Sequence, residues 1–165
     1  MNRPALYDDD ILEWSEEQAA ALRHVARTQP GISNGIDWGN VAEEIETVGR
    51  SEFAAVQSFV RLILVHIIKA VSVLETSSVL HWRKEVVAFH RDLLDRVTPS
   101  MQTRLDIDKL WQQARQQADA DLAVYGQVVG ASLPKQCPIR IDDILASDFD
   151  FVGTADFLRK QIERT

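Results

Sequence analysis

The side chains best suited to chemistry are carboxylates on one short stretch of the chain. They are Glu43, Glu44, Glu46 and Glu52, which fall within about two and a half helical turns. Inward carboxylates of helical bundles can bind metals or cationic substrates. Glu44 falls on the apolar stripe of its helix, but it lies about 12 Å from Glu52 along the axis, too far for both to bind one ion. We therefore favour ion pairs with Arg or Lys, such as Glu46 with Arg50 four residues on.

The histidines offer a second kind of site, because neutral imidazoles bind zinc and other transition metals. His66 and His90 are each twelve residues from an expected turn near position 78, so the two can face each other across a helical hairpin. His24 is a third candidate ligand. His81 and Glu85 form another pair, four residues apart on one helix face. Core histidines with one hydrogen bond are more common than metal ligands, and we predict no metal or other cofactor.

Lys69 follows His66 by three residues and lies near the same helix face. A buried lysine can act as a base, but its stem more often packs while its ammonium pairs with a carboxylate. The sequence holds no nucleotide-binding loop and no serine-hydrolase elbow. Cys137 is the only cysteine, so no internal disulfide can form. Without a complete catalytic set, we favour binding over catalysis.

Composition and charge restrict the partners and the location. The net charge of −7 disfavours binding to nucleic acid, and Arg83, Lys84 and Arg91 form only a local basic cluster. The first ten residues do not resemble a signal peptide. The apolar stretch 62–74 contains two polar residues and is too short to span a bilayer. We expect a cytoplasmic protein that binds neither nucleic acid nor a membrane.

The elements that must position these residues are helices. Apolar residues recur three or four apart along stretches with few Gly or Pro residues, which predicts an all-α fold. The expected main helices span 9–27, 37–75, 79–97 and 99–129, with a helical turn at 141–145 and a last helix at 154–163. The sequence therefore predicts a helical bundle of about four main helices plus a short C-terminal helix, as a single domain over 1–165.

Capping residues and glycines indicate the ends of these helices. The expected N-caps are Asp8, then Asp37 or Asn40, then Thr98 and Thr154. Gly130 is the expected end of the fourth helix, whose inward face includes Tyr125. Gly49 interrupts the interior of the second helix, and we expect another helix to pass close to it there.

A set of short motifs runs through the chain in a fixed order. They are Tyr7–Asp10 with Trp14, Asn40–Glu46 with Gly49–Glu52, His66–Lys69, Trp82-Arg83 with Arg91, Cys137-Pro138 and Ile144-Leu145. This set resembles the bacterial DUF29 family over about residues 7–150, so 154–165 looks like an appended helix. His90 departs from the family pattern, which weakens its pairing with His66 at a metal.

The resemblance implies a helical, cytoplasmic, bacterial protein. The family is named for its unknown function, so it implies no reaction, substrate or catalytic residue. It does single out a group of family-defining positions. These are Glu43, Glu44, Glu46, Gly49, Arg50, Glu52, His66 and Lys69.

Two functions remain as expectations. The first is binding to an unidentified protein partner or self-association, through an exposed apolar groove between helices. The second is a ligand- or metal-binding bundle, or an enzyme, with a polar pocket formed by Glu44, His66 and Lys69. Because Glu44 and His66 are ~33 Å apart along a straight helix, this pocket requires a kink, for example at Gly49, or the help of other helices.

Overall fold

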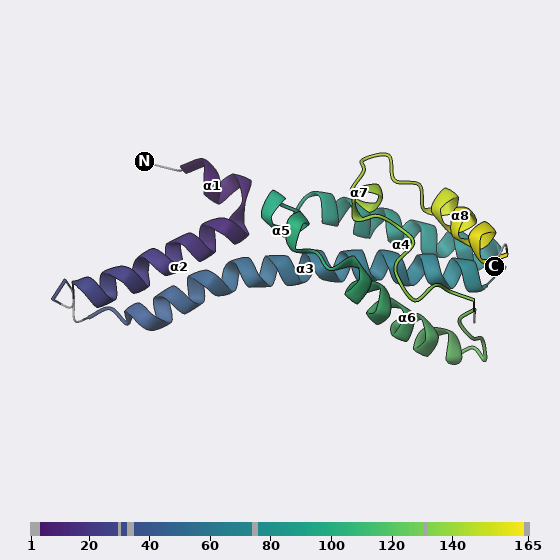
Figure 1. Ribbon diagram of the computed structural model, residues 1–165, viewed down its shortest axis with the longest axis horizontal. Coiled ribbons are helices and arrows are strands. Elements are labelled where there is room, and N and C mark those ends of the chain that lie inside the picture. The colour runs from purple at the N-terminus through teal and green to yellow at the C-terminus, as the bar shows by residue number, and fades with distance from the viewer. Residues whose placement is uncertain (1–3, 30, 33–34, 74–75, 131, 164–165) are drawn as a thin grey trace. The chain divides into compact units, whose positions relative to one another are not determined.

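The computed structural model describes the whole chain except residues 1–3, 30, 33–34, 74–75, 131 and 164–165. Across the described residues the regular structure is helical and no strand occurs, which confirms the predicted all-α fold (Figure 1). The helices are α1 (Pro4–Asp9), α2 (Ile11–Thr28), α3 (Trp38–Ser72), α4 (Thr76–Leu94), α5 (Pro99–Arg104), α6 (Ile107–Ala123), α7 (Ile141–Ile144) and α8 (Phe151–Glu163).

The chain divides into two compact units. The first unit comprises Met1–Val56 and Arg96–Arg104, and the second comprises Gln57–Asp95 and Leu105–Thr165. The long helix α3 contributes its first part to one unit and its second part to the other. The prediction of one domain over 1–165 stays a prediction.

In the first unit, Asp10 separates α1 from α2 and is 4% exposed. Its carboxylate accepts hydrogen bonds from the backbone N–H of Glu13 (3.2 Å) and of Ser100 (2.8 Å). It also accepts from the hydroxyls of Ser100 (2.7 Å) and Thr98 (2.9 Å). The N-cap of α2 is therefore Asp10, and the prediction of Asp8 was wrong because Asp8 lies within α1. One carboxylate holds the start of α2 to the start of α5.

Gly49 lies where α2 and α3 pack closely in the first unit. A Cβ atom at this position would overlap the hydroxyl oxygen of Ser15 and would lie 3.0 Å from the Cα atom of Leu12. Both α2 residues are buried. The expectation that another helix passes close to Gly49 is confirmed, since only a residue without a side chain fits there.

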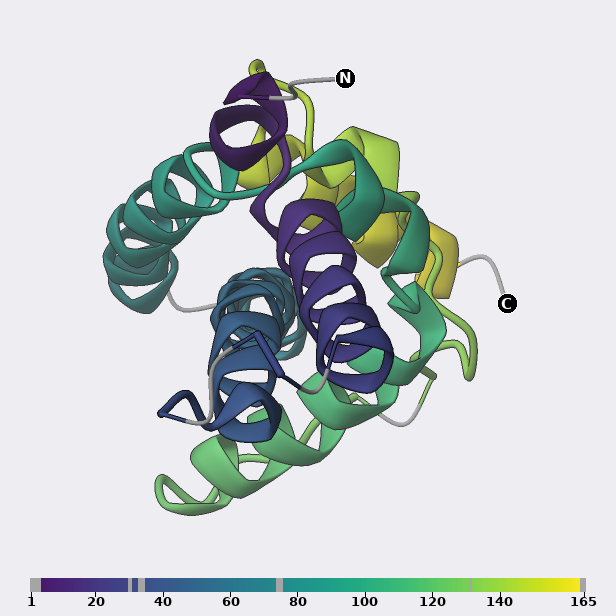
Figure 2. The same ribbon diagram turned by 90° about the vertical axis from the view of Figure 1, so that its left-hand side faces the viewer.

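In the second unit, the rest of α3 forms the core. Every side chain from Ile63 to Ile68 is buried. A helix that is apolar on all sides must be covered on all sides, and α4 and α6 flank this part of α3 on different sides (Figures 1 and 2). By length and composition α3 could cross a membrane, but half of its most apolar window is buried within the protein. The core helix of a globular protein has the same property.

The predicted fourth helix is two helices. It begins as expected after Thr98, but it stops at Arg104, and α6 starts after Asp106. Asp106 caps α6 by accepting a hydrogen bond from the backbone N–H of Lys109 (3.0 Å). A local aspartate therefore overrides a continuous apolar pattern, because the cap satisfies an N–H group that the helix start leaves unpaired.

The end of α6 also differs from the prediction. Gly126, with a φ of 68°, ends the helix, rather than Gly130. Its N–H donates to Ala123 (3.0 Å), and the N–H of Gln127 donates to Leu122 (3.0 Å), which is a Schellman motif. Tyr125 is consequently 80% exposed and does not face the core.

Aspartates also begin α3 and α8. Of the two predicted caps for α3, Asp37 accepts a hydrogen bond from the N–H of Asn40 (3.1 Å). For α8, Asp150 accepts from the N–H of Val152 (3.1 Å), and the predicted cap Thr154 lies inside the helix. The last helix therefore begins three residues earlier than predicted, at Phe151.

Candidate functional site

The acidic stretch of α3 forms ion pairs with α2 in the first unit. Arg23 of α2 contacts Glu46 (2.5 Å) and Glu43 (3.4 Å). Arg50 contacts Glu43 (2.5 Å) and, as predicted, Glu46 four residues earlier (3.7 Å). The hydrogen bond and charge of Arg50 lower the pKa of Glu43, and the same hydrogen bond raises the pKa of Arg50. These carboxylates are neutralised by their neighbours, which supports the structural interpretation.

The other two glutamates of the stretch have different surroundings. Glu52 pairs with Arg96 (2.8 Å). Glu44 is exposed, and its neighbours Val41 and Val48 are 39% and 47% exposed, so this side of α3 is not a core face. Within the described part of the chain, no ion pair or hydrogen bond is recorded for Glu44. The four carboxylates do not converge on one site.

The histidines named as metal candidates make separate contacts. His66 faces Glu85, whereas His90 donates a hydrogen bond from Nε2 to the carbonyl oxygen of Ile144 (2.9 Å). His24 is exposed on α2 in the first unit. Among the described residues, no group of three or more His, Cys, Asp or Glu side chains is placed to bind a metal ion.

His66 lies in a pocket of the second unit, here called the His66 pocket. Its side chain is 9% exposed, and its Nε2 atom is 3.4 Å from Oε2 of Glu85. The imidazole stacks on Phe89, with ring centroids 5.8 Å apart. Its other nitrogen, Nδ1, is buried and has no hydrogen-bond partner among the described residues. His66 is thus a buried polar residue whose hydrogen-bonding capacity is only partly used.

Four charged or titratable side chains surround His66. The ammonium of Lys69 is 3.5 Å from Asp121 of α6, and it lies 5.0 Å from the centre of the Trp82 ring. The interpretation of Lys69 as a packed lysine paired with a carboxylate is thereby confirmed. His81 lies one turn before Glu85 on α4. Its Nε2 atom is 3.8 Å from the Glu85 carboxylate, as the spacing predicted. Glu85 therefore lies between two imidazoles.

Burial and, to a smaller extent, the charge of Lys69 lower the pKa of His66 to about 4, although Glu85 and Asp121 act to raise it. Burial dominates because the protonated imidazole loses its hydration. His66 is consequently neutral near pH 7. At the loop cysteine, burial raises the pKa of the Cys137 thiol to about 11. Cys137 therefore stays protonated near neutral pH, as expected for a packing residue.

The His66 pocket has a volume of about 720 Å³. That is enough space for a small organic molecule. Its lining residues come from α3, α4, α6 and the loop after α6. They are Leu62, His66, Lys69, Ser77, Ser78, His81, Trp82, Glu85, Phe89, Asp121, Leu122, Tyr125 and Gln127. His66 and Lys69 line it as predicted, but Glu44 is not among the lining residues. The sequence analysis did not single out Trp82 or Asp121 for this site.

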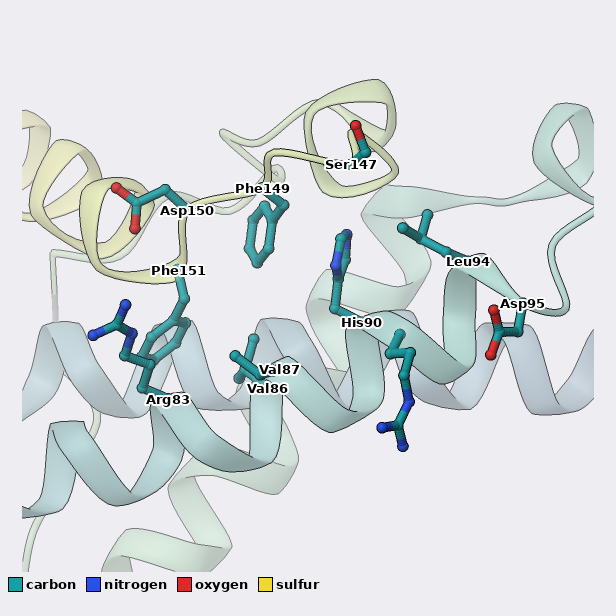
Figure 3. A pocket seen from close by; sticks show the side chains of 11 residues that line it. Arg83, Val86, Val87, His90, Leu94, Asp95, Ser147, Phe149, Asp150 and Phe151 are labelled. Carbon is teal, nitrogen blue, oxygen red and sulfur yellow. The ribbon is translucent and has the colours of Figure 1, made fainter.

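A second cleft lies on another face of α4 and is here called the His90 cleft (Figure 3). Its volume is about 410 Å³. Its apolar side chains come from α4, from the segment before α8 and from Phe151, the first residue of α8. The ring of His90 stands between Phe149 and Leu94 in Figure 3, with 5.2 Å between the His90 and Phe149 ring centroids. Val87, which lines the cleft, is 63% exposed. In the sequence, the Phe149-Asp150-Phe151 triplet could have indicated this cleft, but it was not predicted to form a site.

The basic cluster of α4 does not form a basic stripe. Arg83 and Arg91 line the His90 cleft, but Asp95 and Asp150 line it too. Arg91 also contacts its neighbour Asp92 (3.4 Å). The charges of this cleft are balanced, which differs from the excess of positive charge that binding to a nucleic-acid backbone requires.

Comparison with known proteins agrees with the sequence motifs. A family model described as domain of unknown function DUF29 matches residues 6–150. Among solved structures, the chain is similar to an alpha-helical protein of unknown function from Rhodospirillum rubrum ATCC 11170. The two are 38% identical with a TM-score of 0.87, and the likeness covers 92% of this chain and 96% of that chain. No curated protein matches.

Proposed function

This chain belongs to the DUF29 family, whose function is unknown, and we propose that it acts by binding an extended segment of another protein in the His90 cleft. The observation that carries the proposal is the apolar lining of this cleft, with Val87 63% exposed at its edge. Large exposed apolar side chains in a concave site are typical of sites that another chain covers.

The charges of the His90 cleft fit a chain segment with apolar side chains. In Figure 3, Arg83 lies at the end near Phe151 and Asp95 lies at the end near Leu94. Arg83 lies on α4 and Asp95 directly follows its last residue. The two are twelve residues apart, which is roughly 18 Å along the helix axis. An extended segment of about five residues has this length. Because Asp150 lies at the same end as Arg83 in Figure 3, the charges of the cleft set no direction for this segment.

His90 supplies a polar group in the middle of the cleft. Because Nε2 donates to the carbonyl of Ile144, Nδ1 of the neutral imidazole is an acceptor. A backbone N–H of the bound segment would donate to it. This combination of an apolar floor, one central acceptor and two end charges supports a peptide ligand over a compact small molecule.

The test is affinity capture from the native lysate with two matched variants. Val87→Asp places a charge in the cleft, and Val124→Asp places the same charge at a residue that is 79% exposed and does not line the cleft. We expect the wild type and Val124→Asp to retain one near-stoichiometric protein, and Val87→Asp to lose it. Circular dichroism would check that both variants keep their helical content.

The opposite pattern would refute the His90 cleft as the interface. Loss of the captured protein with Val124→Asp alone would move the interface to the exposed side chains after α6, which are Val124, Tyr125 and Val128. Self-association is the other outcome to distinguish. Light scattering on the purified chain would then show an oligomer that Val87→Asp dissociates.

A further inference from the structure

The His66 pocket holds a polar group that the fold itself leaves unsatisfied. The side chain of His66 is 9% exposed, and its Nδ1 atom has no partner. Since Nε2 faces the carboxylate of Glu85, Nε2 carries the proton in the neutral ring and Nδ1 is a bare acceptor. An acceptor buried without a donor is destabilising. Because Nδ1 has almost no accessible surface, a ligand in the pocket would reach Glu85 and the aromatic rings rather than this atom.

The charges around His66 leave one carboxylate without a cation. Lys69 is 3.5 Å from Asp121, so this ammonium and this carboxylate neutralise each other. Among the described residues, Glu85 lies against two imidazoles, 3.4 Å away at His66 and 3.8 Å away at His81. The lining holds two carboxylates, Glu85 and Asp121, and one ammonium, Lys69, which favours a cationic ligand.

Aromatic rings complete the lining of the pocket. Trp82, Phe89 and Tyr125 all line it, and the Tyr125 ring at its mouth is 80% exposed. The face of an aromatic ring attracts organic cations. Trp82 already has the ammonium of Lys69 5.0 Å from its ring centre. The rings therefore suit the carbon chain and the charge of an organic ammonium ion.

We propose that the His66 pocket binds a small organic ammonium ion. Its charge lies against Glu85, and its carbon chain packs on the aromatic rings. This site uses a different face of α4 from the His90 cleft, so a test of one site does not decide the proposal for the other.

Three probes with the same carbon chain test the ligand class by nuclear magnetic resonance at pH 8, where an imidazole of ordinary pKa is neutral. They are n-butylammonium, n-butyltrimethylammonium and butyrate. We expect n-butylammonium to shift the Trp82 indole and His66 ring resonances in a saturable way. The trimethyl compound should also bind, because it carries the same positive charge. Butyrate should cause no shift.

Charge variants of the pocket then test the geometry. Glu85→Gln should weaken binding of n-butylammonium about tenfold, since it removes the unpaired charge. Asp119→Asn, an equal loss of charge at an exposed α6 residue outside the lining, is the control and should bind like the wild type. Lys69→Gln should bind several-fold more tightly, because it removes the cation that balances Asp121. A role limited to folding would not produce this gain.

Three results would overturn the proposal. They are the absence of saturable shifts with n-butylammonium, binding of butyrate as strong as that of the amine, and equal binding by wild type and Glu85→Gln. Thermal unfolding of each variant, measured beside the titration, separates a lost contact from a lost fold.

Discussion

Asp10, at the start of α2, and His66, on α3, are both buried polar side chains, but they differ in how many of their hydrogen bonds are made. Asp10 is 4% exposed and its carboxylate accepts four hydrogen bonds. His66 is 7% exposed and keeps one nitrogen without a partner beside a large pocket. A buried polar group with all its hydrogen bonds made is a structural element, whereas one with unused capacity at a pocket is a candidate for ligand binding.

The largest expected effect is on the Asp10 side of this comparison. Asp10→Ala removes four hydrogen bonds and leaves donors of Glu13 and Ser100 unpaired, so we expect the free energy of unfolding to fall by about 4 kcal/mol. Urea unfolding measures this change. Asp8→Ala is the matched control, because Asp8 is exposed, and it should change little. A small effect of Asp10→Ala would remove the distinction between the two sites.

The pH dependence of the free energy of unfolding gives a second comparison between the wild type and Asp10→Ala. Burial raises the pKa of its carboxyl, but the hydrogen bonds from Ser100, Glu13 and Thr98 together outweigh burial and lower the pKa below the ordinary 3.8. A carboxyl with a lowered pKa stabilises the fold above its ordinary pKa. The contribution is lost as the pH falls through 3.8 towards the pKa of the folded state.

His66 should give a pH dependence of the same sign as Asp10, but in a higher pH window. Its pKa falls from 6.5 to about 4 on folding, so below pH 6.5 the unfolded chain takes up a proton that the folded chain does not. The wild type therefore loses roughly 3 kcal/mol between pH 7 and pH 4 from this group. His66→Leu should be nearly neutral at pH 7 and should lack this part of the pH dependence. Urea unfolding at several pH values compares the two proteins, and parallel curves would contradict the assignment.

Packing at Gly49 sharpens the same comparison, since α2 and α3 leave no room for a side chain at this position of the first unit. Gly49→Ala should cost about 2 kcal/mol, because the new methyl group meets Ser15 and the backbone of Leu12. Gly39→Ala is the control on the same helix. Its Cβ would lie 3.6 Å from Asp37, an ordinary contact, so this change should be neutral or slightly stabilising. Equal midpoints of thermal unfolding for the two variants would contradict the close approach.

The smallest effect is expected at the ion pairs of α3. Arg50→Ala breaks exposed contacts with Glu43 and Glu46, and solvent screens such pairs. We expect no change in the urea midpoint beyond experimental error. A clear loss of stability would mean that this surface network resembles the Asp10 site more than its exposure indicates.

The Glu46–Arg50 ion pair and the long helices were predictable from the sequence because they depend on residues close in the chain. Glu46 and Arg50 are one turn apart, and Gly49 marked the close helix packing by its type alone. The chosen caps were less predictable. Asp8 and Asp10 are chemically alike, and only the hydroxyls of Thr98 and Ser100, about ninety residues away, select Asp10.

The sequence by itself determined the helical fold, the family and the pairs that lie one turn apart on a helix, Glu46 with Arg50 and His81 with Glu85. Helical periodicity and a spacing of three or four residues are local properties. Only the tertiary structure decided which side chains meet across helices. Lys69 pairs with Asp121, which is fifty-two residues later in the chain, and the ring of Phe149 contacts the ring of His90. Such contacts depend on how helices pack, which a local pattern does not specify. For the same reason Tyr125 was predicted to be inside, although the Schellman turn at Gly126 places it in solvent.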